Sequence, residues 1–116
     1  MNKYEKAIEV FTHFFTHRSM YLSKNDNFYE VTAFLYGYGE ATGVLKGFNT
    51  WIVLNTSINS YYNSVFQKMI IVLTNRRIGI YNEQHEYNYC PAYNNHYIEL
   101  LFDLLLKYLN SQKVAE

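Results

Sequence analysis

Apolar side chains recur at helical spacing over most of this chain, and this periodicity constrains the fold more than any other feature. The segment from Lys3 to Thr16 shows it most simply, with a stripe formed by Tyr4, Ala7, Ile8, Phe11 and Phe15. Residues three and four positions apart lie on one side of an α-helix, because the helix makes one turn every 3.6 residues. The pattern therefore predicts an amphipathic helix here, followed by a polar loop from Ser19 to Asn27.

Four further segments carry related patterns. We expect helices after Asn27, from about Val44 to Leu54, from Ser60 to Thr74, and after Asn94 or Asn95. Asn27 is a favourable N-cap, and Glu30 lies where its carboxylate can reach the amide of the cap residue. In the last helix, the apolar stripe is formed by Ile98, Leu101, Phe102, Leu105 and Leu109.

The segment from Ser60 to Thr74 is open to a second interpretation. Ile70, Ile71 and Val72 are consecutive β-branched residues, and Ile78 to Tyr81 could pair with them in a hairpin near residues 68–81. We favour a helix because the 3.6-residue period holds through the segment. The sequence thus predicts an all-α fold, a single-domain bundle of about five helices over residues 1–116, with an α+β fold as the alternative.

Charge and hydropathy limit the classes of function. The chain holds ten Lys plus Arg and ten Asp plus Glu, so it lacks the positive excess that non-specific nucleic-acid binding requires. Its longest strongly apolar run, Met69 to Leu73, falls far short of the roughly 20 residues of a membrane span. One cysteine, Cys90, excludes an intramolecular disulfide. We expect a cytoplasmic protein whose partners are neither nucleic acid nor membrane.

Few residues are spaced for metal or cofactor chemistry. His13 and His17 stand four positions apart and could face one ion, with a third ligand from His85 or His96. The glutamate that follows the first histidine in metalloprotease helices is absent. The glycines at 37, 39 and 43 do not form the dinucleotide fingerprint. Cys90 lies among carboxylates, a setting that disfavours a reactive thiolate. We therefore expect no metal, no cofactor and no enzymatic activity.

The stretch from Asn82 to Tyr97, here called the tyrosine segment, is the most informative about binding. Tyrosine offers a large contact area at low entropic cost, and carboxylates beside it would steer a basic partner. The candidate partner-binding residues are Glu83, Glu86, Tyr87, Tyr89, Tyr93 and Tyr97. The other interpretation is a loop whose tyrosines fold back over the core.

Two short runs carry a resemblance to a known family. They are Phe34-Leu35-Tyr36-Gly37-Tyr38-Gly39-Glu40-Ala41 and Leu45-Lys46-Gly47-Phe48-Asn49-Thr50-Trp51-Ile52. An aromatic-rich helix ending in glycine and followed by a short L-x-G-F-x-x-W helix resembles small bacterial proteins of toxin–immunity loci, including those of contact-dependent inhibition and polymorphic toxins. The matching residues are Gly37, Leu45, Gly47, Phe48 and Trp51, which by their types serve the fold more than a site.

The resemblance implies an immunity protein that binds and neutralises a cognate toxin domain in the cytoplasm. Such proteins need no catalytic residues. Two rival hypotheses are a self-associating structural or adaptor protein, for which a homodimer is possible, and a hydrolase that uses His13, His17, His85 or His96. The second rival is the weakest, because spacing alone does not bring a nucleophile, a base and an orienting group together.

Overall fold

Five α-helices account for most of the described chain. The computed structural model describes residues 1–22, 26–58, 65–80 and 86–115. The helices are α1 (Lys3–Thr16), α2 (Phe28–Thr42), α3 (Phe48–Asn55), α4 (Phe66–Arg77) and α5 (Asn94–Ala115), with short 3-10 turns η1 (Arg18–Met20) and η3 (Pro91–Tyr93). The described residues contain no strand, which confirms the predicted all-α class.

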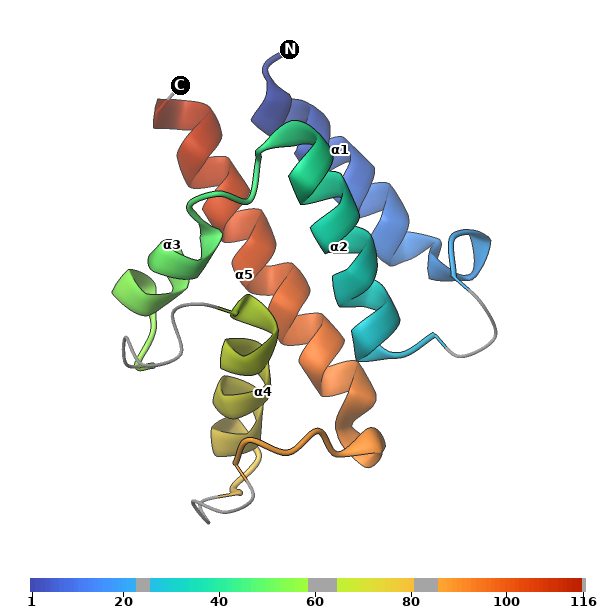
Figure 1. Cartoon of the computed structure of the whole chain (residues 1–116), viewed down its shortest axis with the longest axis vertical. Helices are drawn as coiled ribbons and strands as arrows, with labels where there is room; N and C mark the ends of the chain where they lie inside the picture. The colour runs from blue at the N-terminus through green and yellow to red at the C-terminus, as the bar shows by residue number, and fades with distance from the viewer. Residues whose placement is uncertain (23–25, 59–64, 81–85, 116) are drawn as a thin grey trace.

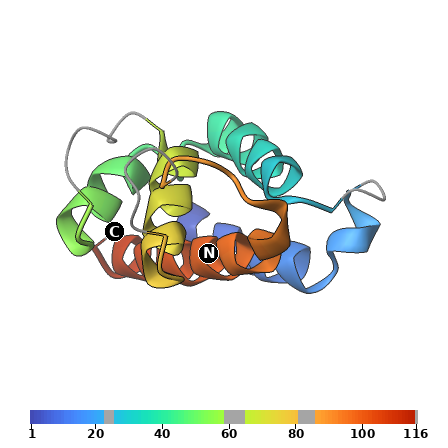
Figure 2. The ribbon, with the colours of Figure 1, turned by 90° about the horizontal axis from the view of Figure 1, so that it is seen from below.

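The helices form two layers. Helix α1 runs antiparallel to α5, and the N- and C-termini lie at the same end of the molecule (Figure 1). Seen from below, α1 and α5 make one layer, while α2, α4 and α3 lie over it (Figure 2). The molecule is flat, with extents of 44 × 34 × 19 Å. The two layers bury the apolar faces of their helices against each other, as the apolar stripes in the sequence require.

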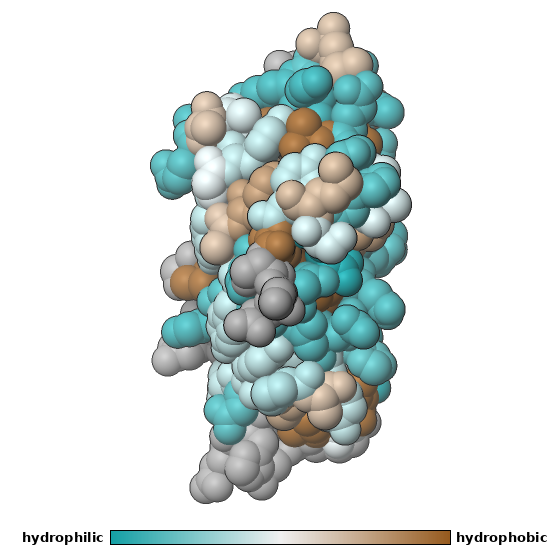
Figure 3. All heavy atoms as spheres, turned by 90° about the vertical axis from the view of Figure 1, so that its right-hand side faces the viewer, coloured by the Kyte–Doolittle hydropathy of each residue, from teal (hydrophilic) through white to brown (hydrophobic). Residues whose placement is uncertain are grey.

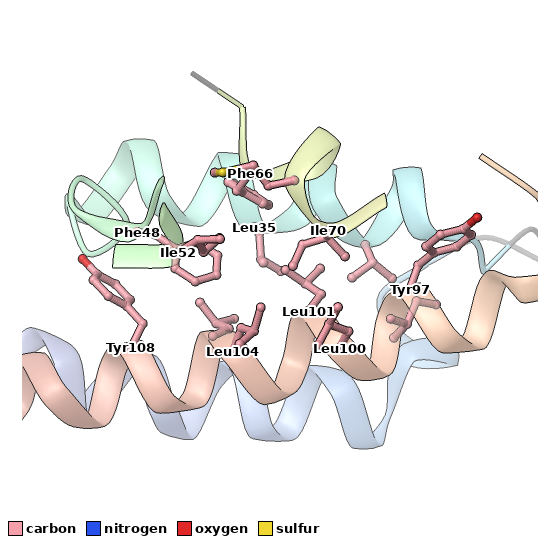
Figure 4. Packing of buried hydrophobic residues seen from close by; sticks show 14 of the residues in the cluster. Leu35, Phe48, Ile52, Phe66, Ile70, Tyr97, Leu100, Leu101, Leu104 and Tyr108 are labelled. Carbon is pink, nitrogen blue, oxygen red and sulfur yellow. The ribbon is translucent and has the colours of Figure 1, made fainter. Parts of the chain in front are cut away.

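Helix α5 is the central element of the core. Its side chains Tyr97, Leu101 and Tyr108 point toward the opposite layer, in which Leu35 of α2 and Phe48 of α3 are also buried (Figure 4). Tyr108 is anchored at both ends, because its ring packs 5.2 Å from Phe48 and its hydroxyl donates a 2.9 Å hydrogen bond to the Val44 carbonyl. Helix α5 contacts each of the other four α-helices.

The bounds of α2 follow from residues at its two ends. Asn27 Oδ1 accepts a 3.0 Å hydrogen bond from the Glu30 amide, so the predicted N-cap is confirmed. At the other end Gly43 adopts the left-handed conformation, with φ of 75°, and its amide donates to the Gly39 carbonyl. A residue with a Cβ is strained in this conformation, so glycine ends the helix at little cost.

Two expectations about the middle of the chain need correction. The alternative hairpin near residues 68–81 is wrong, because residues 66–77 form α4. Its β-branched residues Ile70, Ile71 and Val72 are buried in the helix, where packing outweighs their preference for strands. The third helix begins at Phe48 rather than Val44, since turns occupy residues 44–47. Residues 60–64 of the predicted fourth helix lie outside the described residues.

The face formed by α1 and α2 is largely hydrophilic, with small separated apolar areas (Figure 3). Scattered apolar atoms are normal on a protein surface, so this face gives no sign of a large apolar docking patch. Among the described helices, none combines the length and hydrophobicity that crossing a membrane requires.

Candidate partner-binding surface

The described part of the tyrosine segment crosses one end of the molecule, from the C-terminal end of α4 past the start of α2 to the start of α5 (Figure 1). Its candidate residues divide by exposure. Tyr87 is 47% exposed and Tyr93 is 37% exposed, whereas Glu86 is 8% exposed and Tyr97 is fully buried. Tyr89 is half-buried. Glu83 lies outside the described residues. The exposed Tyr87 and Tyr93 fit the interpretation of the segment as a contact surface. The buried Glu86 and Tyr97 fit the interpretation of a loop that folds back over the core.

A buried asparagine fastens the segment to α4. Asn75 Nδ2 donates hydrogen bonds of 2.8 and 2.9 Å to the carbonyls of Glu86 and Asn88. Its Oδ1 accepts a 2.7 Å bond from the hydroxyl of Tyr97, which in turn accepts a 3.0 Å bond from the Cys90 amide. These bonds supply partners for polar groups that would otherwise be buried without any. Burial raises the pKa of Tyr97 to about 12.

An ion pair adds a second fastening next to the first. Arg76 Nε and Nη2 donate to the two carboxylate oxygens of Glu86 at 3.2 and 3.3 Å. A two-pronged arginine–carboxylate pair fixes orientation as well as position. Because the Glu86 carboxylate is mostly buried and faces Arg76, its charge serves the fold of the segment, and it presents little negative charge to a partner.

Asn94 ties the far end of the segment to α2. Its Oδ1 accepts a 2.8 Å hydrogen bond from the Phe28 amide and a 2.6 Å bond from the Tyr89 hydroxyl. Its Nδ2 donates to the Asp26 carbonyl at 3.3 Å. The last helix begins at Asn94 itself, slightly before the predicted start after Asn94 or Asn95. The Asn94 side chain satisfies the first amide of α2, a group left without a partner inside that helix.

Two ring contacts involve tyrosines near these anchors. Tyr89 packs edge-on against Tyr29 at 4.8 Å, and Tyr93 packs against His96 at 5.8 Å. Tyr29, on the first turn of α2, is 44% exposed. We call Tyr29, Tyr87, Tyr89 and Tyr93 the tyrosine surface. Burial also raises the pKa of Tyr89 above its ordinary value, and its hydroxyl donates to Asn94.

Sequence reasoning missed Tyr29, Asn75 and Asn94. Tyr29 was not among the predicted contact residues, because it is distant in sequence from the tyrosine segment and only the fold brings it to Tyr89. Asn75 carried a weak signal, since it lies two residues after Leu73, the last residue of a buried apolar run. A polar residue beside such a run requires hydrogen-bond partners, although the sequence does not say where they are.

The histidine and cysteine candidates occupy separate places. His13 and His17 stack at 4.4 Å between ring centroids, and His13 is hydrogen-bonded through Nδ1 to the Tyr21 hydroxyl. Within residues 1–22, 26–58, 65–80 and 86–115, no three His, Cys, Asp or Glu residues come together as a metal site would require. His85 lies outside this part of the chain. The Cys90 thiol lies 3.6 Å from the Asn88 carbonyl.

Comparisons with protein-family models, with curated proteins and with solved structures find no match to this chain.

Proposed function

We propose that this chain is an immunity protein, which binds a cognate bacterial toxin domain through the tyrosine surface and neutralises it without catalysis in the cytoplasm. The observation that carries the proposal is a set of exposed tyrosines held on a hydrogen-bonded frame. The resemblance of residues 34–52 to proteins of toxin–immunity loci supplies the kind of partner.

The frame favours binding for an energetic reason. A loop that must become ordered when it meets a partner loses part of its binding free energy to that ordering. Here Asn75, Asn94 and the Arg76–Glu86 ion pair already hold the backbone that carries Tyr87 and Tyr93. Tyrosine side chains have few rotatable bonds, so their fixation adds little further cost.

The six candidate residues therefore receive different roles in the proposal. Tyr87, Tyr89 and Tyr93 supply contact area and hydroxyl groups to the toxin domain, together with Tyr29. Glu86 and Tyr97 position the segment, as their ion pair and buried hydrogen bonds support. Glu83, which lies outside the described residues, keeps its proposed role as an electrostatic contact.

Co-expression with the toxin encoded by the neighbouring gene tests the proposal. We expect the two proteins to co-purify and the chain to rescue growth. A double variant, Tyr87→Ala with Tyr93→Ala, should weaken the complex at least about 30-fold, because central tyrosines at interfaces typically contribute 2 kcal/mol or more.

The matched control is Tyr36→Ala. Tyr36 is 40% exposed, yet it lies on α2 with its ring stacked on Phe66, away from the tyrosine segment. Its replacement should leave the dissociation constant unchanged. Absence of co-purification and rescue would refute the immunity function. Equal losses for the double variant and the control would refute the tyrosine surface as the contact.

The exposed rings of Tyr29, Tyr87 and Tyr93 also favour a second candidate, an adaptor protein that self-associates through the same surface. Light scattering on the isolated chain separates the two. A concentration-dependent dimer that the Tyr87 and Tyr93 replacements abolish would favour the adaptor, whereas a monomer that binds the toxin favours the immunity protein.

A further inference from the structure

Two histidines near the C-terminal end of α1 form a pair that the proposed function does not use. His13 and His17 are four positions apart, so their side chains lie on the same side of the helix. Their ring centroids are 4.4 Å apart, with the ring planes 22° from parallel, and both residues are exposed. A dissolved ion can therefore reach both imidazoles at once.

A hydrogen bond fixes which nitrogen of His17 is available. His17 Nδ1 lies 3.1 Å from the carbonyl oxygen of His13 and is hydrogen-bonded to it. Because a carbonyl oxygen only accepts, Nδ1 carries the hydrogen and donates it, and Nε2 of the neutral ring keeps its lone pair. An imidazole in this state can bind a metal ion through Nε2.

Tyr21 provides an equivalent arrangement for His13. Its hydroxyl is hydrogen-bonded to His13 Nδ1 and can accept the hydrogen of that nitrogen, which leaves the lone pair on Nε2. The Tyr21 ring packs edge-on against Phe14 at 5.4 Å and Phe34 at 5.5 Å, so the hydroxyl is held in place. Metal-binding histidines usually donate their other ring hydrogen to an oxygen, and here both can do so. Within the described residues, neither Nε2 makes a hydrogen bond.

The electrostatic setting of the pair also favours a cation. His13 lies in the last turn of α1 and His17 is its C-cap, at the end of the helix where the dipole is negative. The neighbouring cation, Arg18, donates from Nε to both carboxylate oxygens of Asp26, at 3.1 and 3.0 Å. Because Asp26 balances its charge, Arg18 opposes a bound cation only weakly.

From these features we infer that His13 and His17 together bind one divalent ion of a late transition metal, such as Ni²⁺ or Zn²⁺, through their two Nε2 atoms. Imidazole nitrogen suits these ions, whereas Mg²⁺ and Ca²⁺ prefer oxygen. Water completes the coordination, because the described residues place no third His, Cys, Asp or Glu at the pair. The rings turn so that both lone pairs meet the ion, a rotation that is rapid for exposed side chains.

Titration of the full chain with Ni²⁺ alone, followed by calorimetry, tests the inference. We expect saturable binding of one ion per chain, binding that weakens on acidification as protons compete for the imidazoles, and no binding of Mg²⁺. The folded helix brings the two rings together, whereas the unfolded chain does not. Ni²⁺ should therefore also raise the midpoint of thermal unfolding, and more so at higher concentration.

The variants separate the pair from histidine in general. His17→Ala leaves one imidazole and should weaken Ni²⁺ binding at least about tenfold, since even the outer-shell partners of metal ligands contribute that much. Thr12→His combined with His17→Ala restores the number of histidines at adjacent positions, which do not face each other on a helix, and should not restore binding. His96→Ala, at an exposed position of α5, is the matched control and should leave the affinity unchanged.

Three results would overturn the inference. The first is a titration without saturable Ni²⁺ binding, or binding that leaves the unfolding midpoint where it was. The second is equal affinity in His17→Ala and His96→Ala. The third is full affinity in the combined Thr12→His and His17→Ala variant, which would show that spacing does not matter. None of these measurements involves the toxin or the tyrosine surface, so failure here leaves the test of the proposed function intact.

Discussion

The hydroxyl of Tyr97 donates a 2.7 Å hydrogen bond to Oδ1 of Asn75, and both side chains are fully buried. The pair joins α4 to α5 in the interior, while the other groups of Asn75 hold the backbone of the tyrosine segment. One amide side chain thus connects the core to the candidate surface. Changes in this pair should alter both stability and the order of the segment.

Replacing Asn75 with alanine should lower the free energy of unfolding by about 3 kcal/mol. The variant leaves the carbonyls of Glu86 and Asn88 and the Tyr97 hydroxyl without their partner, and a buried polar group without one costs roughly 1–3 kcal/mol. The free-energy costs of these three lost bonds do not add fully, because the bonds share one side chain. Urea unfolding measures the effect. Asn110→Ala is the control, because Asn110 is exposed on α5 and should change stability by no more than about 0.5 kcal/mol. A cost as small as that of the control would contradict the assigned role of Asn75.

Alkaline pH should destabilise the fold through Tyr97. Burial raises the pKa of Tyr97 to about 12, above the value of about 10 for an exposed tyrosine. The folded chain therefore holds this proton more tightly than the unfolded chain does. The resulting stabilisation is complete below about pH 10 and is lost as the pH rises toward about 12.

Unfolding measured between pH 8 and 12 checks this dependence. Tyr97→Phe removes the titrating hydroxyl and should make the decline of stability above pH 10 shallower. Tyr21→Phe, which removes the hydroxyl of an exposed tyrosine, should leave the slope as it is. The same slope in the wild type and in Tyr97→Phe would show that Tyr97 does not carry the effect.

The sequence predicted the parts of the fold that local patterns determine. The first helix has the predicted bounds, and Asn27 caps α2 as expected, because both depend on residues within one or two helical turns. The third helix starts later than its apolar pattern indicated, since Val44 is buried from a turn and its carbonyl accepts the Tyr108 hydroxyl. The spacing of apolar residues indicates which side chains are buried, but it does not separate a helix from a turn. Val44 is buried although it lies in a turn.

The candidate surface was less predictable because it depends on contacts between distant residues. In the sequence, Tyr87 and Tyr97 are equivalent members of a tyrosine-rich stretch, yet the first is exposed and the second is buried. Tyr97 bonds in the interior to Asn75, a residue of another helix that the local sequence does not reveal as its partner. Asn94 shows the same limit, since its side-chain oxygen accepts a hydrogen bond from the amide of Phe28, 66 positions away in the sequence.

Two glycines, one inside α2 and one directly after it, should respond in opposite directions to replacement by alanine. Gly43 has φ of 75°, so Gly43→Ala places a Cβ in a strained conformation and should destabilise the fold by about 1 kcal/mol. Gly37 lies within the helix, and a Cβ there meets nothing within 4 Å. Gly37→Ala should therefore stabilise by roughly 0.5–1 kcal/mol through helix propensity. Thermal unfolding of the two variants gives the sign of each change, and the same sign for both would contradict the end of α2 at Gly43.

Replacing Asn94 with alanine should loosen the junction between α2 and the tyrosine segment. The variant removes the acceptor for the Phe28 amide and the Tyr89 hydroxyl and the donor to the Asp26 carbonyl. Because these groups are only partly buried, water replaces some of the lost bonds, and we expect a cost of about 2 kcal/mol. Hydrogen exchange should speed up at the Phe28 amide more than in the middle of α5. Asn95→Ala, at the exposed neighbouring position, should change neither quantity appreciably. If Phe28 exchanged equally slowly in both variants, the first turn of α2 would be held by some other contact, and Asn94 would not be the residue that joins it to the surface.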